Sequence, residues 1–142
     1  MRSKALLVAN IFATLYMVVL VWAVVSVAIS LGTFDVVQMF GAIGALFGGL
    51  AEMFGASVIV ATYLSAMIVL YFVHIVLFVL GSIIGWIAFA AKKSGGAYCA
   101  AVMYLIGTIC FPIFLAFALP ITIIGFAGGN NQKAINQKAS AA

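Results

Sequence analysis

Charged side chains are almost absent from a long stretch of this chain. Between Lys4 and Lys92 the only fully charged residues are Asp35 and Glu52. Soluble proteins are roughly a quarter charged, whereas this chain is 6% charged and 68% hydrophobic. So few polar side chains cannot cover a water-exposed surface. We therefore predict that the chain folds in the lipid bilayer, as an all-α integral membrane helical bundle of a cell membrane.

The first apolar run, Ala5–Leu31, is long enough to cross a bilayer, because a crossing helix needs about 20 apolar residues. Its basic start at Arg2 and Lys4 resembles a signal peptide. However, the apolar region of a signal peptide is only roughly 7–15 residues long. We therefore expect a retained membrane helix that ends at Gly32.

A short glycine-rich run, Val36–Ala51, comes next. As a helix it would span about 24 Å, against a hydrocarbon core of about 30 Å. In lipid, small residues at GxxxG spacing let a neighbouring helix approach closely. This face would pack within the monomer or against a second copy, and both alternatives stay open. The predicted helix-packing residues are Gly41, Gly44, Gly48 and Gly49.

Two longer apolar runs follow, Val58–Ala91 and Ala97–Ala127. The first is longer than a single crossing needs. Pro112 and Pro120 interrupt the second, and each proline lacks the N–H that a helix interior uses. We predict one final helix that is bent at one of these prolines, with its freed carbonyls turned toward the bundle.

We predict one domain, with a bundle over residues 1–129 and a frayed polar tail over 130–142. The three long runs predict three spans, and Val36–Ala51 would be a fourth. Four membrane-embedded helices are favoured, because an apolar run should not lie in water. The alternative is three spans plus a glycine-rich helix in the interface. The positive-inside rule does not decide, because either arrangement puts four of the six basic residues on one side.

His74 and Glu52 are the candidate intramembrane polar site. His74 is the only histidine and lies near the middle of Val58–Ala91, where an ionisable group is expensive. It would serve as a proton relay or ligand contact, or simply as a neutral imidazole bonded to a neighbouring helix. We expect it to be neutral and to face protein. Glu52 would be a solvated helix end or a carboxylate that faces a pore.

The sequence contains no recognisable catalytic or metal-binding motif. No set of nucleophile, base and orienting group occurs, and there is no phosphate-binding glycine loop. Cys99 and Cys110 lack metal-ligand spacing. On one helix they would lie about 16 Å apart, which is too far for a disulfide. We predict no enzymatic activity, no cofactor and no metal. No nucleic-acid partner is expected, because the basic residues occur in pairs and not in a run.

Several short motifs resemble a group of small multispan membrane proteins of Gram-positive bacteria that have no assigned activity. The motifs are Lys4-x-Leu6, Thr14-Leu15-Tyr16, His74 with an apolar run to Lys92-Lys93, Tyr104, Pro120 and Gly125-Phe126. The glycine-rich region is not part of this resemblance. The resemblance implies a bacterial cell membrane and does not imply a mechanism.

These observations favour a small accessory or interaction subunit. It would work through helix–helix contacts with itself or with a larger membrane protein. The alternative is an oligomeric pore, channel or holin-like protein built on the glycine-rich helix, with Glu52 and His74 near the path. A transporter would usually contain internal repeats, and the sequence has none.

Overall fold

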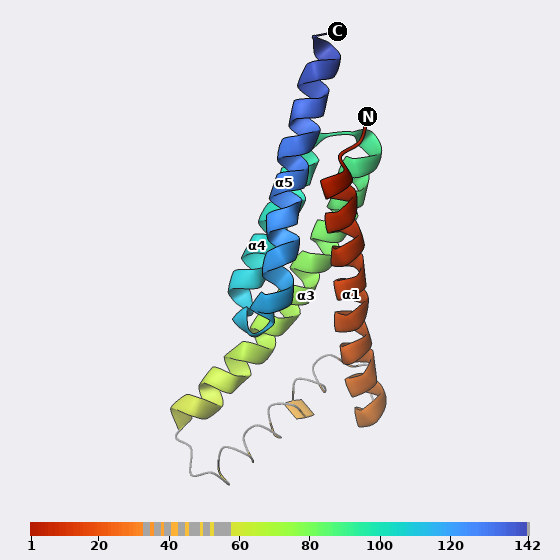
Figure 1. The fold of residues 1–142 in the computed structure, drawn as a ribbon. Coiled ribbons are helices and arrows are strands. Elements are labelled where there is room, and N and C mark those ends of the chain that lie inside the picture. Colours follow the sequence, from red (N-terminus) through yellow and green to blue (C-terminus); the bar gives the residue numbers. More distant parts are fainter. Residues whose placement is uncertain are drawn as a thin grey trace.

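The computed structural model describes residues 1–32, 35, 38, 41, 42, 45, 49, 52 and 58–141. Within these residues the elements are α1 (Lys4–Leu31), α3 (Val58–Ala91), α4 (Ser94–Cys110), the 3-10 helix η1 (Pro112–Phe114) and α5 (Leu115–Ser140). The four α-helices alternate in direction, so both termini lie at the same end of the bundle (Figure 1).

Helix α1 has a defined start and stop. The Ser3 hydroxyl accepts a hydrogen bond from the Leu6 N–H at 3.2 Å, which satisfies one of the free donors of the first turn. Gly32 ends the helix in the left-handed conformation, at φ 67°, and its N–H bonds back to the last turn. The observed helix agrees with the predicted Ala5–Leu31 to within one residue.

Helix α3 is continuous over Val58–Ala91, which are the bounds of the predicted apolar run. The chain then reverses through Lys92 and Lys93. Lys92 has a φ of 55°, in the left-handed region. The next helix begins at Ser94, so α3 and α4 form a tight antiparallel pair.

The prediction of one bent helix over Ala97–Ala127 is wrong. The helix ends before Phe111, and the chain reverses through η1 into α5. Pro112 has no N–H to continue the helical bonding, so a break is favoured there. Gly125 of α5 lies against Ala101 of α4, which places the two helices side by side and antiparallel (Figure 1).

The prediction of a frayed tail over 130–142 is also wrong for most of its length. Helix α5 contains Pro120 in its interior and continues through Ser140. Gln132 is fully buried, and its Oε1 accepts a hydrogen bond from the Ser3 N–H at 2.9 Å. This polar part of α5 is therefore held by the other end of the chain.

The all-α helical bundle is confirmed, while the number of membrane-embedded helices is a separate question. Three described helices, Lys4–Ser30, Val69–Ala91 and Pro112–Ser140, are long and apolar enough to cross a membrane. Helix α4 is apolar but has only 17 residues. Most of the predicted helix Val36–Ala51 lies outside the described residues.

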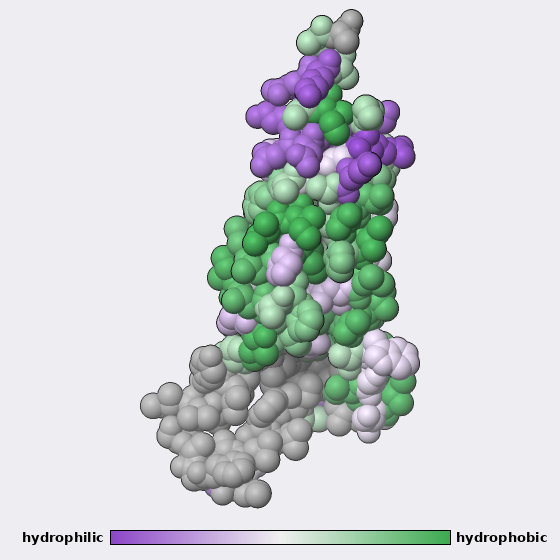
Figure 2. Space-filling model, viewed as in Figure 1, coloured by the Kyte–Doolittle hydropathy of each residue, from purple (hydrophilic) through white to green (hydrophobic). Residues whose placement is uncertain are grey.

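All the basic side chains of the chain lie at the end that carries both termini. The Arg2 guanidinium lies 5.3 Å from the centre of the Phe89 ring. The Asn136 side chain donates to the Lys92 carbonyl at 2.9 Å. Figure 2 shows hydrophilic residues gathered at this end and hydrophobic residues over the described body below. The residues of this basic end are Arg2, Lys4, Lys92, Lys93, Lys133 and Lys138.

The two acidic residues lie at the opposite end. Asp35 follows the far end of α1, which is 28 residues or about 42 Å long. Glu52 precedes the far end of α3, which is 34 residues or about 51 Å long. An extended chain advances at most about 3.6 Å per residue, so neither residue can reach the basic end. The bundle therefore separates its charges by sign.

Glycines bring the described helices close together, although not the glycines that the sequence singled out. A Cβ on Gly128 would lie 2.7 Å from the Leu6 Cα, so α1 and α5 touch through their backbones there. A Cβ on Gly107 would lie 3.1 Å from the Phe78 ring. The main buried cluster consists of Ala13, Phe78, Ala100, Tyr104, Ala118 and Ile121.

Candidate functional site

His74 connects three helices. It is fully buried on α3. Its Nδ1 lies 2.7 Å from the Gly107 carbonyl oxygen of α4, and its Nε2 lies 2.8 Å from the Tyr16 hydroxyl of α1. A carbonyl can only accept, so Nδ1 carries the proton and Nε2 of a neutral ring accepts from the hydroxyl. The prediction that His74 faces protein is confirmed.

The Gly107 carbonyl, near the end of α4, can bond to His74 because a carbonyl oxygen has two lone pairs and can accept two hydrogen bonds. The Gly107 carbonyl accepts from the Phe111 N–H at 3.2 Å and still has room for the imidazole. The sequence predicted that the carbonyls freed by the prolines, those of Thr108 and Ala116, turn inward. The carbonyl that meets His74 is instead that of Gly107, which keeps its helical partner.

His74 lies at the middle of α3, 18 residues or about 27 Å along the helix from Lys92. Aromatic rings surround it. The Phe78, Phe111 and Phe114 ring centres lie 4.7, 6.0 and 6.2 Å from the imidazole. The predicted depth of His74 in the membrane stays a prediction.

A second polar cluster joins α1 to α3. The Asn10 amide donates to the Gly85 carbonyl at 2.9 Å. The Thr14 hydroxyl donates to the Asn10 carbonyl at 2.8 Å, so the Ser82 hydroxyl, 3.2 Å away, donates to Thr14. The Trp86 indole also donates to Thr14, at 2.9 Å. These bonds hold α1 against α3, although the Asn10 Oδ1 is buried and accepts no hydrogen bond from the described residues.

This second cluster uses a glycine pair that sequence reasoning did not single out for packing. Gly81 and Gly85 have the same four-residue spacing as a GxxxG motif. A Cβ on Gly81 would lie 2.7 Å from the Tyr104 ring, and one on Gly85 would lie 2.5 Å from the Asn10 Oδ1. The four-residue spacing of two glycines within an apolar run was the available signal.

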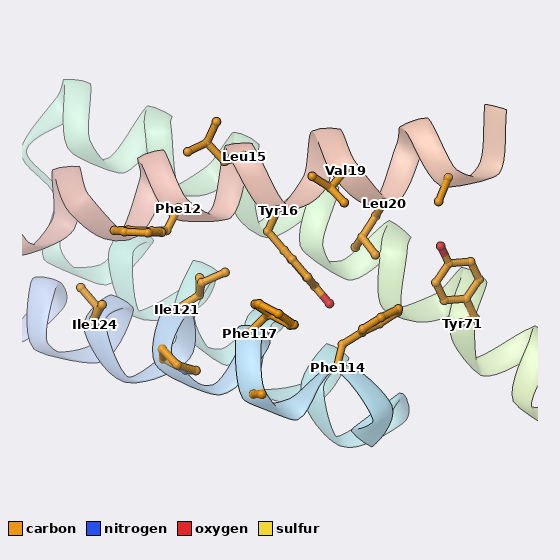
Figure 3. A pocket seen from close by; sticks show the side chains of 13 residues that line it. Phe12, Leu15, Tyr16, Val19, Leu20, Tyr71, Phe114, Phe117, Ile121 and Ile124 are labelled. Atoms are coloured by element: carbon orange, nitrogen blue, oxygen red, sulfur yellow. The ribbon is translucent and has the colours of Figure 1, made fainter. Parts of the chain in front are cut away.

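An apolar cleft of about 550 Å³ opens between α1 and α5 (Figure 3). The two helices touch near the basic end and diverge away from it (Figure 1). Among the described side chains that line the cleft, Tyr16 and Tyr71 supply the only polar atoms. One wall of the cleft includes Phe12, Leu15 and Val19 of α1, and the opposite wall includes Phe117, Pro120 and Ile124 of α5.

The other predicted site residues do not join His74 in the described part of the chain. Glu52 is exposed and helical. Gly41 and Gly49 are helical, and an added Cβ at either position would meet no atom of the described residues within 4 Å. Gly44 and Gly48 lie outside the described residues, so the packing of this glycine face stays a prediction.

The described residues contain no cluster of three or more His, Cys, Asp or Glu side chains that could hold a metal ion. Cys99 and Cys110 both lie on α4 and both are free.

Comparison with models of known protein families, with curated protein sequences and with solved structures finds no match to this chain. The functional inference therefore rests on the geometry of the bundle. The resemblance to small multispan proteins of Gram-positive bacteria stays an expectation.

Proposed function

We propose that this chain is a small, non-enzymatic, multi-pass protein of a cell membrane, and that it acts as an accessory or interaction subunit through helix–helix contacts. In this proposal α1, α3, α4 and α5 are all embedded in the bilayer. Helix α4 is about 25 Å long, at the short end of the range for a crossing helix. Its antiparallel partners, α3 and α5, cover it on two sides.

The cleft between α1 and α5 carries this proposal. A flat apolar surface needs no protein partner in a bilayer, because hydrocarbon solvates it as well as another helix would. A cleft is different, because a partner helix can pack its side chains against both walls at once, and close packing drives helix association in lipid. Leu15 and Phe117, on opposite walls, are 59% and 66% exposed in the isolated chain.

The polar groups of the bundle support a structural role over a catalytic one. Both nitrogens of His74 are engaged, one with Gly107 and one with Tyr16. A general base needs a free nitrogen within reach of its substrate. The Tyr16 hydroxyl already donates its hydrogen bond to His74, so the surface of the cleft is mainly apolar.

Site-specific photocrosslinking in intact membranes tests this proposal. A benzophenone amino acid replaces Phe117 in the cleft. In the matched control it replaces Ile109, which is 70% exposed on α4 and does not line the cleft. We expect a discrete protein–protein product from position 117 and none from position 109.

The mass of the product identifies the partner class. Twice the mass of the monomer indicates self-association, and another discrete mass indicates a different membrane protein. A ladder of higher multiples would favour the oligomeric pore, which ion flux in liposomes would then test. If both positions label only lipid, the proposed docking role of the cleft is wrong.

A further inference from the structure

A second cleft, at the basic end, is lined by cations. Its volume is about 380 Å³, and it lies between the first residues of the chain and the last turns of α5. Arg2, Lys4 and Lys138 contribute positive charge, while Ala134 and Ile135 contribute apolar surface. We refer to it as the basic cleft.

No carboxylate neutralises these cations in the described part of the chain. The two acidic residues of the sequence, Asp35 and Glu52, belong to the opposite end of the bundle. The Arg2 guanidinium is held against the bundle by its contact with the Phe89 ring. A guanidinium is suited to a phosphate, to which it can donate two parallel hydrogen bonds.

The basic cleft also lies where the chain changes from polar to apolar. Lys4 is the first residue of α1, and the apolar run begins directly after it. On the other wall, α5 passes from its apolar half into the polar turns that contain Asn131 and Lys138. This is the level of lipid headgroups when α1 and α5 cross a bilayer.

We propose that the basic cleft binds the phosphate of an anionic phospholipid headgroup. The cations would hold the phosphate, and Ala134 and Ile135 would contact the less polar part of the same lipid. A free phosphate ion would leave that apolar lining unmatched. By the positive-inside rule, the leaflet concerned is the cytoplasmic one, where anionic lipids attract basic residues. This inference depends on membrane insertion and not on the docking of a partner at the α1–α5 cleft.

Lipid binding to the purified full-length chain tests the proposal. Phosphatidylglycerol and phosphatidylcholine with identical acyl chains are titrated in neutral detergent, and native mass spectrometry counts the bound lipids. The variant Arg2→Gln/Lys138→Gln removes two cations from the basic cleft. The control Lys92→Gln/Lys93→Gln removes the same charge from the same end but outside that cleft.

We expect wild type to prefer phosphatidylglycerol. The cleft variant should bind it roughly thirtyfold more weakly, which corresponds to about 1 kcal/mol for each of two cations. The affinity of the control variant for phosphatidylglycerol should fall by less than about threefold, because Lys92 and Lys93 only add to the general positive potential at this end. If the double variant does not fold, Lys4→Gln and Lys133→Gln, inside and outside the cleft, replace the two pairs.

Three results would overturn the proposal. Equal weakening in both variants would mean that only general positive potential acts. Equal binding of the two lipids would mean that the headgroup charge is not recognised. Competition by inorganic phosphate at the same concentration as the lipid would mean that the site takes free phosphate.

Discussion

Each ring nitrogen of His74 has one partner, and the two partners come from different helices. Gly107 belongs to α4 and Tyr16 to α1, while His74 itself belongs to α3. In a low-dielectric interior a polar group that loses its partner is expensive, because nothing replaces the bond. At this scale the imidazole acts as a tie between helices, and its neutral form is the one that fits both partners.

Replacing Tyr16 by phenylalanine should reveal this tie. Tyr16→Phe keeps the ring and removes the hydroxyl that donates to His74, so a buried acceptor is left unpaired. We expect the free energy of unfolding to fall by about 1–3 kcal/mol, measured by denaturant titration in mixed micelles. Tyr71→Phe is the control, because Tyr71 lines the same cleft and no hydrogen bond joins its hydroxyl to His74. Equal losses in the two variants would argue against a special role for the Tyr16 bond.

The helices differ in how well the sequence predicted them. The bounds of α1 and α3 were predictable because long apolar runs end at residues that stop a helix in lipid, Gly32 and Lys92. The hairpin of α4 and α5 was not predictable in this way, because its turn at Phe111 and Pro112 is as apolar as the two helices. Hydropathy does not show where an apolar chain reverses its direction. The distribution of the basic residues indicates the reversal, because a turn at Pro112 places all six of them at one end of the bundle.

The polar partners within the bundle were harder still to predict. The helices are apolar on nearly all sides, so the sequence pattern does not show which face turns inward. His74 and Asn10 could be expected to seek partners. That these partners are Tyr16 and the Gly85 carbonyl depends on how α1 is rotated against α3, which only the packing determines.

A cysteine pair distinguishes the hairpin from a bent helix. In a background without Cys99 and Cys110, Ala101→Cys and Gly125→Cys should form a disulfide on oxidation. A Cβ on Gly125 would lie 3.3 Å from the Ala101 Cβ, close to the usual separation in a disulfide. In one helix the two residues would be about 36 Å apart. A gel shift measures the bond, and its absence would count against the hairpin.

The contact between α1 and α5 can be tested at Gly128. Gly128→Ala puts a methyl group 2.7 Å from the Leu6 Cα, and backbone atoms cannot move aside as a side chain can. We expect the free energy of unfolding, measured by thermal unfolding in detergent, to fall by about 1–3 kcal/mol. The control Gly95→Ala meets nothing within 4 Å on α4 and should be neutral or stabilising, because alanine favours helix by up to about 1 kcal/mol. A stable Gly128→Ala protein would contradict the close contact.

At the scale of the whole molecule, charge is sorted along the bundle axis. The basic residues mark one end, and Asp35 and Glu52 belong to the other. The basic end also carries both termini and the link between α3 and α4 (Figure 1). A membrane protein with this distribution has one strongly favoured orientation, because basic residues remain on the cytoplasmic side.

Cysteine labelling from the two sides of the membrane tests this orientation. Gly95→Cys and Ser140→Cys, each in a background without Cys99 and Cys110, should react with an impermeant maleimide only from the cytoplasmic side. Glu52→Cys should react only from the outside. Inverted and right-side-out vesicles provide the two conditions. Reaction of residues 95 and 140 from opposite faces would contradict the topology.

The bond between the Ser3 N–H and Gln132 links residues 129 positions apart. A ribosome adds roughly 5–20 residues per second, so α1 waits about 6–26 s before its partner on α5 has been made. Helix α1 can remain in the bilayer without its partner during this time, because a helix satisfies its own backbone groups while its apolar side chains face hydrocarbon. The bundle is therefore completed only after the last helix has been synthesised, and a chain interrupted before Gln132 cannot close it.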